Sequence, residues 1–440
     1  MKGPHKIQPL RRALINAGWI VLGSSLQRLM PFFTFPVLSR RLGHEAFGQY
    51  IAAIALSAIV TQIVEFGFNI SATSKVAESD SNNKIKMSQI LSEVIAGRLL
   101  ISLVLIATLF FVRQFHDVFI ADNWLFWSSV SLGIVIGSDF RFMFYGRQSV
   151  RYLTFYALTY TLLSTLVILI AVRETNSLWL AFFVPAIIAL ALILFSVWLI
   201  KPNLNALFPN RTSALVGLRE SWPAFVQRGL VQIGSNLNPL ILGFFVTPTI
   251  VGYFGLAERL LRQAALFAIN PAQSTMLPHV GALRSSNPRQ ASREFLMICG
   301  GLFGASLIGG VFVYILAPFI AWLFLGESPP EAYLPLRILC FSPSLLVLNQ
   351  FGFSLWLFFA RRQGANNIIT LGFVLTTSIT VSIAAAQWGQ VGACWAIIIS
   401  QIIFTLVYTV YCHSDGVAPW QVKNGFPECQ ELDRSSLEKK

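Results

Sequence analysis

Apolar residues occur along this chain in long runs that short polar segments separate. About 20 consecutive apolar residues in a helix cross the roughly 30 Å hydrocarbon core of a bilayer. We interpret the first run as an uncleaved helix, because it is too long for a signal peptide and lacks a small-x-small cleavage site. The pattern therefore predicts about twelve transmembrane helices, at residues 13–38, 47–69, 93–112, 123–140, 152–172, 178–200, 220–245, 250–280, 294–318, 334–360, 366–386 and 391–412.

The twelve spans form two sets of six on either side of a polar segment at residues 202–219. Transporters are often built from two such repeats. We expect an N-terminal lobe over 1–212, a C-terminal lobe over 213–412 and a cytoplasmic tail over 413–440. Three residues after the first helix also match three after the seventh, which supports the division: Gly48, Ala53 and Leu56 against Gly252, Ala257 and Leu260.

The composition excludes an ordinary soluble enzyme. Hydrophobic residues make up 55% of the chain and charged residues 12%, with a mean hydropathy of +0.66, whereas a soluble domain has about 25% charged residues. The net charge of +13 comes from cations in small groups between the apolar runs, without a basic stretch that would bind nucleic acid. We therefore expect membrane lipids, and no nucleic acid, among the partners.

The cations also predict the orientation of the chain. With an even number of spans, both termini and alternate loops share one side of the membrane, and that side holds 22 Lys and Arg residues against five on the other. Cytoplasmic loops carry the excess of Lys and Arg in membrane proteins. The charge pattern thus predicts a multi-pass membrane protein with both termini in the cytoplasm.

No motif of an enzyme or of a metal centre is evident. The chain has no Walker loop, GxSxG elbow, HExxH helix or Rossmann glycine pattern. The five histidines are scattered, and the five cysteines, which show no CxxC spacing, are Cys299, Cys340, Cys394, Cys412 and Cys429. We expect no catalytic residue, no metal and no cofactor.

Five arginines fall inside the predicted spans, where an arginine at the bilayer centre costs about 2.5–3.5 kcal/mol. Four of them lie too deep to reach the membrane surface, and these four either pair within the helix bundle or line a solvated cationic cavity: Arg28, Arg228, Arg259 and Arg262. The pattern favours the cavity, because polar residues follow one face of the seventh span at a spacing of three or four. The arginines are Arg28, Arg98, Arg228, Arg259 and Arg262, and the stripe is Arg228, Gln232, Ser235, Asn236 and Pro239.

Acidic residues and prolines in the spans leave alternatives open. Glu258 precedes Arg262 by four residues and is expected to neutralise part of its charge. Glu65 and Arg98 either form a structural ion pair or take part in a proton or sodium relay, for which Asp139 is a weaker candidate. Prolines in the first and seventh spans predict bends that are either static kinks or gating points: Pro31, Pro36 and Pro239.

Several motifs occur in the order found in one transporter family. They begin with Leu42-Gly43, Phe47-Gly48-x-Tyr50 and the segment 65–73. Similar stretches follow at 144–152, 218–225, 236–243 and 251–259. Together they resemble bacterial polysaccharide transporters of the Wzx flippase type, in the multidrug/oligosaccharidyl-lipid/polysaccharide exporter superfamily. The chain differs from the usual pattern in having Glu65 in place of Asp, and Arg98 and Arg259 where Lys is frequent.

The resemblance implies two six-helix lobes around a central cavity that opens alternately to either face. Members of this type flip undecaprenyl-pyrophosphate-linked oligosaccharides for O-antigen, capsule or exopolysaccharide assembly, and other assembly proteins are possible partners. Guanidinium groups suit a pyrophosphate because they donate bidentate hydrogen bonds to it. The alternatives are a drug or metabolite antiporter of the same superfamily and a membrane polymerase or ligase, which the short outer loops disfavour.

Overall fold

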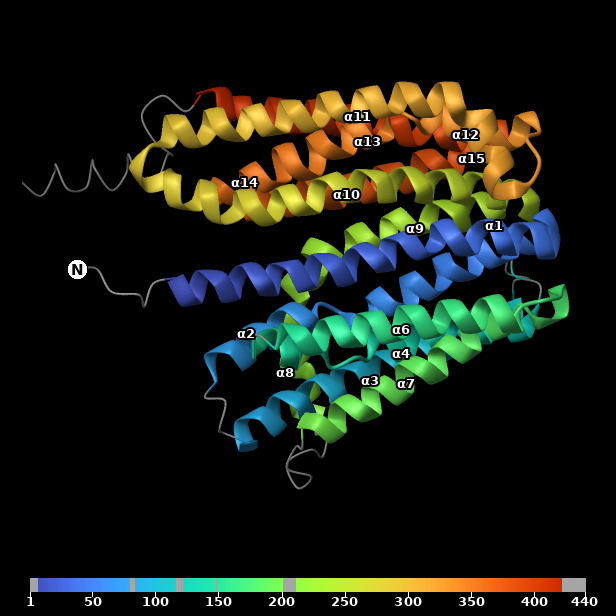
Figure 1. Ribbon diagram of the computed structural model, residues 1–440, viewed down its shortest axis with the longest axis horizontal. Coiled ribbons are helices and arrows are strands. Elements are labelled where there is room, and N and C mark those ends of the chain that lie inside the picture. Colours follow the sequence, from blue (N-terminus) through green and yellow to red (C-terminus); the bar gives the residue numbers. More distant parts are fainter. Residues whose placement is uncertain are drawn as a thin grey trace, which may run out of the picture. The chain divides into compact units, whose positions relative to one another are not determined.

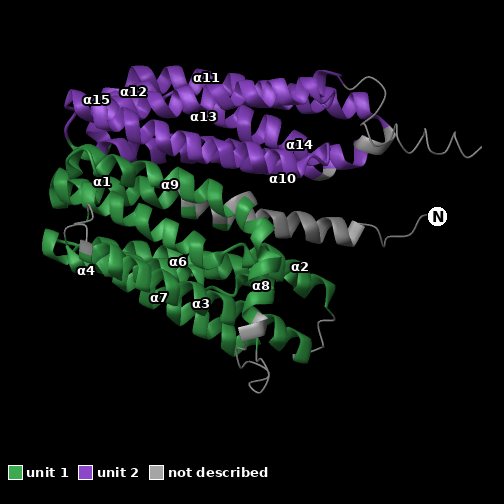
Figure 2. Cartoon of the chain, turned by 180° about the vertical axis from the view of Figure 1, so that it is seen from behind, with its two compact units in different colours: residues 1–252, 324–326 green, residues 253–323, 327–440 purple. Residues whose placement is uncertain are grey.

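The computed structural model describes residues 7–79, 84–115, 120, 122–147, 149–200 and 211–421. Within these residues all regular structure is helical. The chain divides into two compact units, which Figure 2 shows in different colours. Unit 1 contains residues 1–252 and 324–326, and unit 2 contains residues 253–323 and 327–440.

Unit 1 begins with α1 (Ile7–Glu65), which covers the first two predicted spans. Gly43 interrupts its helical geometry with φ 79° and ψ 169°, a backbone conformation that essentially only glycine adopts. The chain turns back at the end of the first span (Figure 1), so α1 contains two helices joined at one residue. The prediction of two separate spans here agrees with this break.

The rest of the first half is a series of helices joined by short connections. Asp122 caps the N-terminus of α4 by accepting a hydrogen bond from the Trp124 backbone N–H at 2.9 Å. The helices are α2 (Phe68–Glu78), α3 (Lys84–Phe115), α4 (Asn123–Gly137), α5 (Arg141–Gly146), α6 (Val150–Ala171), the short 3₁₀ helix η2 (Thr175–Ser177) and α7 (Leu180–Ile200).

The seventh predicted span is helical throughout, but its geometry changes in the middle. It consists of α8 (Arg211–Ala224), the π-helix η4 (Phe225–Gly229) and α9 (Leu230–Gly243). Within unit 1, α8 packs against α2 and α3, and α9 packs against α1 (Figure 1). These contacts place the start of the predicted C-terminal lobe in the same compact unit as the first half, and the lobe boundary at residue 212 stays a prediction.

Unit 2 contains most of α10 (Pro248–Ser286) and the helices that follow it. Its core includes Phe295, Phe351 and Trp356, all fully buried. Gly389 interrupts the last long helix with φ 58° and ψ −139°, between the two last predicted spans. The helices are α11 (Pro288–Leu325), α12 (Pro330–Leu339), α13 (Ser342–Leu346), the π-helix η5 (Val347–Ser354), α14 (Leu355–Phe359), α15 (Gln363–Ser414) and the 3₁₀ helix η6 (Pro419–Gln421).

Each of the twelve predicted spans coincides with helical residues. By length and apolar composition, seven helical segments of the described chain qualify as membrane spans. The number is smaller than twelve partly because two of these segments contain two predicted spans each, on either side of Gly43 and Gly389. In addition, α4 is only 15 residues long, and α10 carries Glu258, Arg259 and Arg262.

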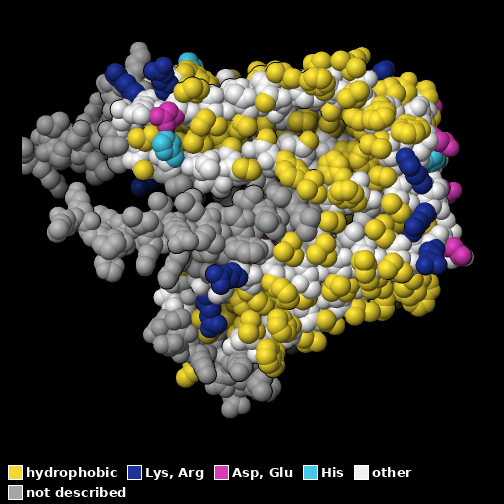
Figure 3. Space-filling view, viewed as in Figure 1, with side chains coloured by type: hydrophobic (Ala, Val, Ile, Leu, Met, Phe, Trp, Pro, Cys, Tyr) yellow, Lys and Arg dark blue, Asp and Glu magenta, His cyan; other side chains and the backbone are white. Residues whose placement is uncertain are grey.

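The outer surface of the helices has the character expected in lipid. Large hydrophobic side chains are exposed along α3 and α11, among them Leu103 and Phe110 on α3 and Phe312 and Ile315 on α11. In the face shown in Figure 3, hydrophobic side chains cover the middle of the helices and charged side chains lie near their ends. Exposed apolar surface of this extent on a soluble monomer would cause association, whereas in a bilayer it is the lipid contact.

Candidate functional site

The in-span charges of unit 2 lie on α10. Glu258 is buried and forms an ion pair with Arg262, one helical turn further along, as their spacing predicted. Arg259 and Gln263 are half-buried on the same helix. The charge of Arg262 is therefore compensated by Glu258.

The polar stripe of the seventh span lies on α9 and is bonded within that helix. Asn236 donates from Nδ2 to the Gln232 carbonyl at 2.8 Å, and the Ser235 hydroxyl donates to the same carbonyl at 3.0 Å. Gln232 itself is exposed, and Pro239 is buried. The helix continues through Pro239 without a break in its geometry, so the proline does not end the span.

Arg28 and Arg228 belong to described helices, but their side chains lie outside the described residues. Arg28 is in α1, and Arg228 is in the π-helix η4. Pro31 and Pro36 are half-buried, and α1 keeps helical geometry through both. The strong departure from helical geometry in α1 is at Gly43, so a gating role for the prolines stays a prediction.

Arg98 is 3% exposed and connects three elements of unit 1. Its guanidinium donates to the Asp139 backbone carbonyl and, at 3.1 Å, to Oδ1 of Asn69. It also lies over the rings of Phe68 and Phe142, at 5.8 and 5.7 Å from their centroids. Arg98 thus ties α3 to the start of α2 and to the end of α4.

The acids near Arg98 have other partners. Asp139 is buried, and its carboxylate accepts from Arg141 Nε at 2.5 Å and from the Arg141 backbone N–H at 3.1 Å. This carboxylate raises the pKa of Arg141 above its usual value. Glu65 accepts a hydrogen bond from Gln62 at 3.1 Å. Among the described residues no hydrogen bond joins Glu65 to Arg98, and a part for Glu65 in ion coupling stays a prediction.

A second polar group lies in unit 2 around the π-helix η5. Asn349 donates to the Gln401 carbonyl at 3.3 Å and accepts from the Thr405 hydroxyl at 3.0 Å. Ser342 and the Gln401 side chain are bonded to each other at 3.0–3.1 Å. The sequence does not single out this polar group, because uncharged polar residues are frequent in membrane helices. π-Helical segments often occur at functional sites.

A contact between α8 and the α2–α3 pair is a second feature that the sequence pattern does not indicate. Lys75 forms ion pairs with Glu93 of α3, at 2.6 Å, and with Glu220 of α8. The hydroxyls of Ser71 and Ser221 are 2.6 Å apart. The sequence gives no signal for this contact, because its two sides are separated by about 150 residues.

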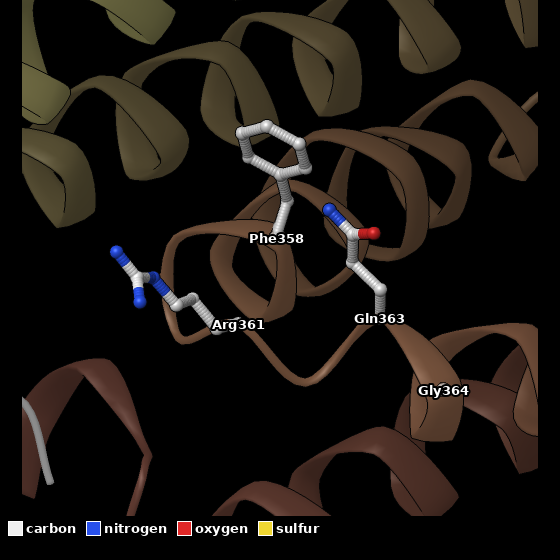
Figure 4. A pocket seen from close by; sticks show the side chains of 4 residues that line it. All are labelled: Phe358, Arg361, Gln363 and Gly364. Atoms are coloured by element: carbon white, nitrogen blue, oxygen red, sulfur yellow. The ribbon is translucent and has the colours of Figure 1, made fainter. Parts of the chain in front are cut away.

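An open pocket lies at the turn between α14 and α15 and is lined by Phe358, Arg361, Gln363 and Gly364 (Figure 4). Arg361 has a positive φ of 55° in this tight turn. None of the residues that the sequence pattern selected lines this pocket. Among the described residues there is also no group of three or more His, Cys, Asp or Glu side chains that could hold a metal ion.

The fold is similar to that of solved membrane transporters. It is similar to a multidrug resistance MATE transporter of the MOP superfamily in its inward-facing conformation, with a TM-score of 0.69 and 14% identity over 90% of this chain and 98% of that one. The lipid II flippase MurJ, in an inward closed conformation, gives a TM-score of 0.62 and 16% identity over 89% and 87%.

The sequence then assigns the family. The pattern of the family described as "Polysaccharide biosynthesis protein" matches residues 13–283, more than half of the chain, and the chain belongs to this family. A relative from Escherichia coli (strain K12), named "Putative O-antigen transporter", is 24% identical over 92% of this chain and 97% of its own. A relative of the same name from Shigella dysenteriae is 22% identical over 87% and 94%.

Proposed function

We propose that this protein is a flippase that moves undecaprenyl-pyrophosphate-linked oligosaccharide units across the bacterial inner membrane for O-antigen, capsule or exopolysaccharide assembly. The observation that carries the proposal is the match to relatives named as O-antigen transporters over almost the whole length of both chains. The family assignment and the fold likeness to a lipid II flippase support it. No covalent step is required, which agrees with a transporter and not an enzyme.

The in-span arginines suit such a cargo. A pyrophosphate carries two or more negative charges, and each guanidinium can donate two parallel hydrogen bonds to it. We propose that Arg28, Arg228, Arg259 and Arg262 solvate the pyrophosphate during transport, with Gln232 and Asn236 beside them, while the polyprenyl tail remains in lipid. Glu258 compensates part of the charge of Arg262 on α10.

We also propose the architecture of twelve spans in two lobes that rock around a central cavity. The helical residues at all twelve predicted positions support the count, as do the glycine breaks at Gly43 and Gly389. The excess of cations in alternate loops supports cytoplasmic termini. Alternating access between the lobes would expose the cargo first to one leaflet and then to the other.

The second candidate is a cation-coupled drug or metabolite antiporter, which the likeness to a MATE transporter favours. Cationic cargo requires carboxylates in the transport path. In the described residues, two of the buried or in-span acids are already paired with arginine: Glu258 with Arg262, and Asp139 with Arg141. Glu65 remains for such a role. The charge balance therefore supports an anionic cargo.

The test is the distribution of lipid-linked oligosaccharide between the two leaflets in a strain that lacks this gene and any redundant flippase. Accumulation on the cytoplasmic face, relieved by the wild-type gene, is expected. Arg28→Ala and Arg259→Ala should reduce transport about tenfold or more, because one charge-assisted hydrogen bond contributes about 1.5–3 kcal/mol. If the distribution of lipid-linked oligosaccharide between the leaflets does not change, the antiporter becomes the better supported function.

The matched control is an arginine outside the proposed path. Arg113 is unsuitable as a control because it has a structural role. It donates hydrogen bonds to Asn123 Oδ1 at 2.9 and 3.1 Å and to the Ile120 carbonyl at 2.9 Å, and these bonds hold the connection between α3 and α4. Arg173 is exposed, and its Nε donates a hydrogen bond to the Ile170 carbonyl, three residues earlier, at 3.1 Å. Arg173→Ala should therefore transport at the wild-type rate, and equal losses in all variants would contradict the cationic path.

A further inference from the structure

The open pocket at the turn between α14 and α15 is not part of the proposed pyrophosphate path. It has a volume of about 440 Å³, within the range typical of small-molecule sites, and it lies wholly in unit 2. Its lining combines a guanidinium and an amide, which donate hydrogen bonds, with an apolar ring: Arg361, Gln363, Phe358 and Gly364 (Figure 4). Since none of these four residues is acidic, the lining suits an anion that carries an apolar portion.

The two arginines of this turn have different surroundings. Arg362 forms an ion pair with Asp415, with 3.0 Å between Nε and Oδ2, and it does not line the pocket. Arg361 is exposed and lines the pocket, and its side chain extends away from the turn in Figure 4. A phosphate group in the pocket would meet the Arg361 guanidinium, which can donate two parallel hydrogen bonds to it.

An exposed apolar face of α15 begins at the pocket. It starts at Gly364 and continues with Ile368, Leu371 and Leu375, at a spacing of three or four residues. These three side chains are 74%, 36% and 55% exposed, and Phe358 in the pocket itself is 42% exposed. A molecule whose anionic end lies in the pocket can therefore place an acyl chain along this face. A soluble anion would leave the face unused.

The pocket lies where anionic lipids are expected. The turn follows the predicted span at 334–360, and Arg361 and Arg362 are among the cations that predict the cytoplasmic side. The cytoplasmic leaflet has a negative surface potential because it contains anionic lipids. One phosphodiester charge matches the one cationic side chain of the lining. A pyrophosphate carries two or more negative charges and would require more cations than these four residues supply.

We propose that this pocket is a binding site for an anionic phospholipid of the cytoplasmic leaflet. The phosphate lies beside Arg361 and Gln363, the glycerol backbone lies over Phe358, and one acyl chain follows the face of α15 that begins at Gly364. The inference does not depend on the proposed function. A lipid bound here stabilises unit 2 whether or not the protein moves oligosaccharide.

The first experiment measures lipid binding to the purified, delipidated full-length protein. Native mass spectrometry counts the bound molecules of phosphatidylglycerol and gives the dissociation constant of the first. Phosphatidylcholine with the same acyl chains is the comparison without net charge. Phosphatidylglycerol should bind about fivefold more tightly, the effect of one arginine on an anionic lipid, and should raise Tm more. Equal binding of the two lipids would overturn the proposal.

The matched pair of variants is Arg361→Asn and Arg362→Asn. Each removes one cation from the same turn, so the general attraction of anionic lipid falls equally in both. Asparagine tolerates the positive φ of 55° at position 361, so the turn is kept. Arg361→Asn should weaken phosphatidylglycerol binding about tenfold, because it removes charge-assisted hydrogen bonds to the phosphate. Arg362→Asn should weaken it less than about threefold, and equal losses in both would overturn the site.

A second variant fills the pocket without changing any charge. A Cβ at Gly364 meets nothing within 4 Å, so the side chain of Gly364→Leu can occupy the pocket without a clash. Gly301→Leu on α11 is the control, because a Cβ there also meets nothing within 4 Å. Gly364→Leu should lose phosphatidylglycerol affinity, and Gly301→Leu should bind as the wild type does. Unchanged binding in Gly364→Leu would show that the lipid lies elsewhere.

Competition distinguishes a phospholipid from other sources of phosphate. Inorganic phosphate and undecaprenyl pyrophosphate are each added, at the concentration of the lipid, to protein that holds phosphatidylglycerol. Neither should displace it. Displacement by inorganic phosphate would make the pocket a site for a soluble anion, and displacement by undecaprenyl pyrophosphate would make it a site for the cargo. Either result would overturn the phospholipid assignment, whereas a failure of the proposed flippase function alone would leave it unchanged.

Discussion

Gly48 and Gly252, the two glycines that correspond in the internal repeat, are in direct backbone contact. A Cβ at Gly252 would lie 3.0 Å from the Cα of Gly48, and a Cβ at Gly48 would lie 1.8 Å from the Pro248 carbonyl oxygen. The repeat therefore marks a place where the second helix of α1 and the first turn of α10 meet without side chains. Only glycine at both positions permits this approach.

Gly48→Ala should disrupt this contact, because the new methyl group cannot coexist with the Pro248 carbonyl. We expect a loss of roughly 2 kcal/mol or more, as is typical of overpacking, visible as a lower Tm of the detergent-purified protein. Gly301→Ala is the control, since nothing lies within 4 Å of a Cβ there. A Gly48→Ala protein as stable as Gly301→Ala would contradict the close approach.

Arg98→Ala should destabilise unit 1 strongly. The substitution leaves the Asp139 carbonyl and the Asn69 side chain without their buried donor, and an unsatisfied buried polar group costs about 1–3 kcal/mol. The measurement is Tm beside that of Arg293→Ala, an exposed cation on α11. If both variants melt at the same temperature, Arg98 is not the connection between α2, α3 and α4 that its contacts indicate.

The Glu258–Arg262 pair should respond asymmetrically to substitution. Arg262→Gln removes the ion-pair partner of the buried Glu258 carboxylate, whereas Glu258→Gln leaves a half-buried arginine that can reach water. Removing one partner of a buried pair costs about 3–5 kcal/mol, so Arg262→Gln should lower Tm more than Glu258→Gln. The double variant should recover part of the loss, and additive losses would argue against a functional ion pair.

Gly43→Ala tests the break in α1. Its φ of +79° is unfavourable for any residue with a Cβ, although nothing lies within 4 Å of that position. The expected cost is about 1–3 kcal/mol from backbone strain alone. Gly364→Ala also has no neighbour within 4 Å but lies in the first turn of α15, so it should be neutral or slightly stabilising. Equal Tm values would show that α1 does not need glycine at the turn.

The hydrophobic pattern predicted where the helices lie, but it predicted side-chain contacts only between residues of the same helix. Apolar runs found each helical stretch, because a bilayer imposes length and composition on any span. The Glu258–Arg262 pair followed from a spacing of four on one helix. By contrast, Arg98 binds the Asp139 backbone carbonyl, and nothing in a sequence marks which carbonyl receives a side chain. In the sequence, Lys75 is only one of the cations that indicate topology, because its pairing with Glu220 depends on how α8 folds back.

Gly43 joins the first two spans with no loop between them. One glycine, and not a loop of several residues, reverses the chain here. The helix that carries Arg28 is therefore joined directly to the helix that carries Glu65, at whose end the chain turns through Phe66 and Gly67 into α2. Any change in the angle between these two helices has to be taken up in the backbone at Gly43, the residue type with the widest range of backbone conformations.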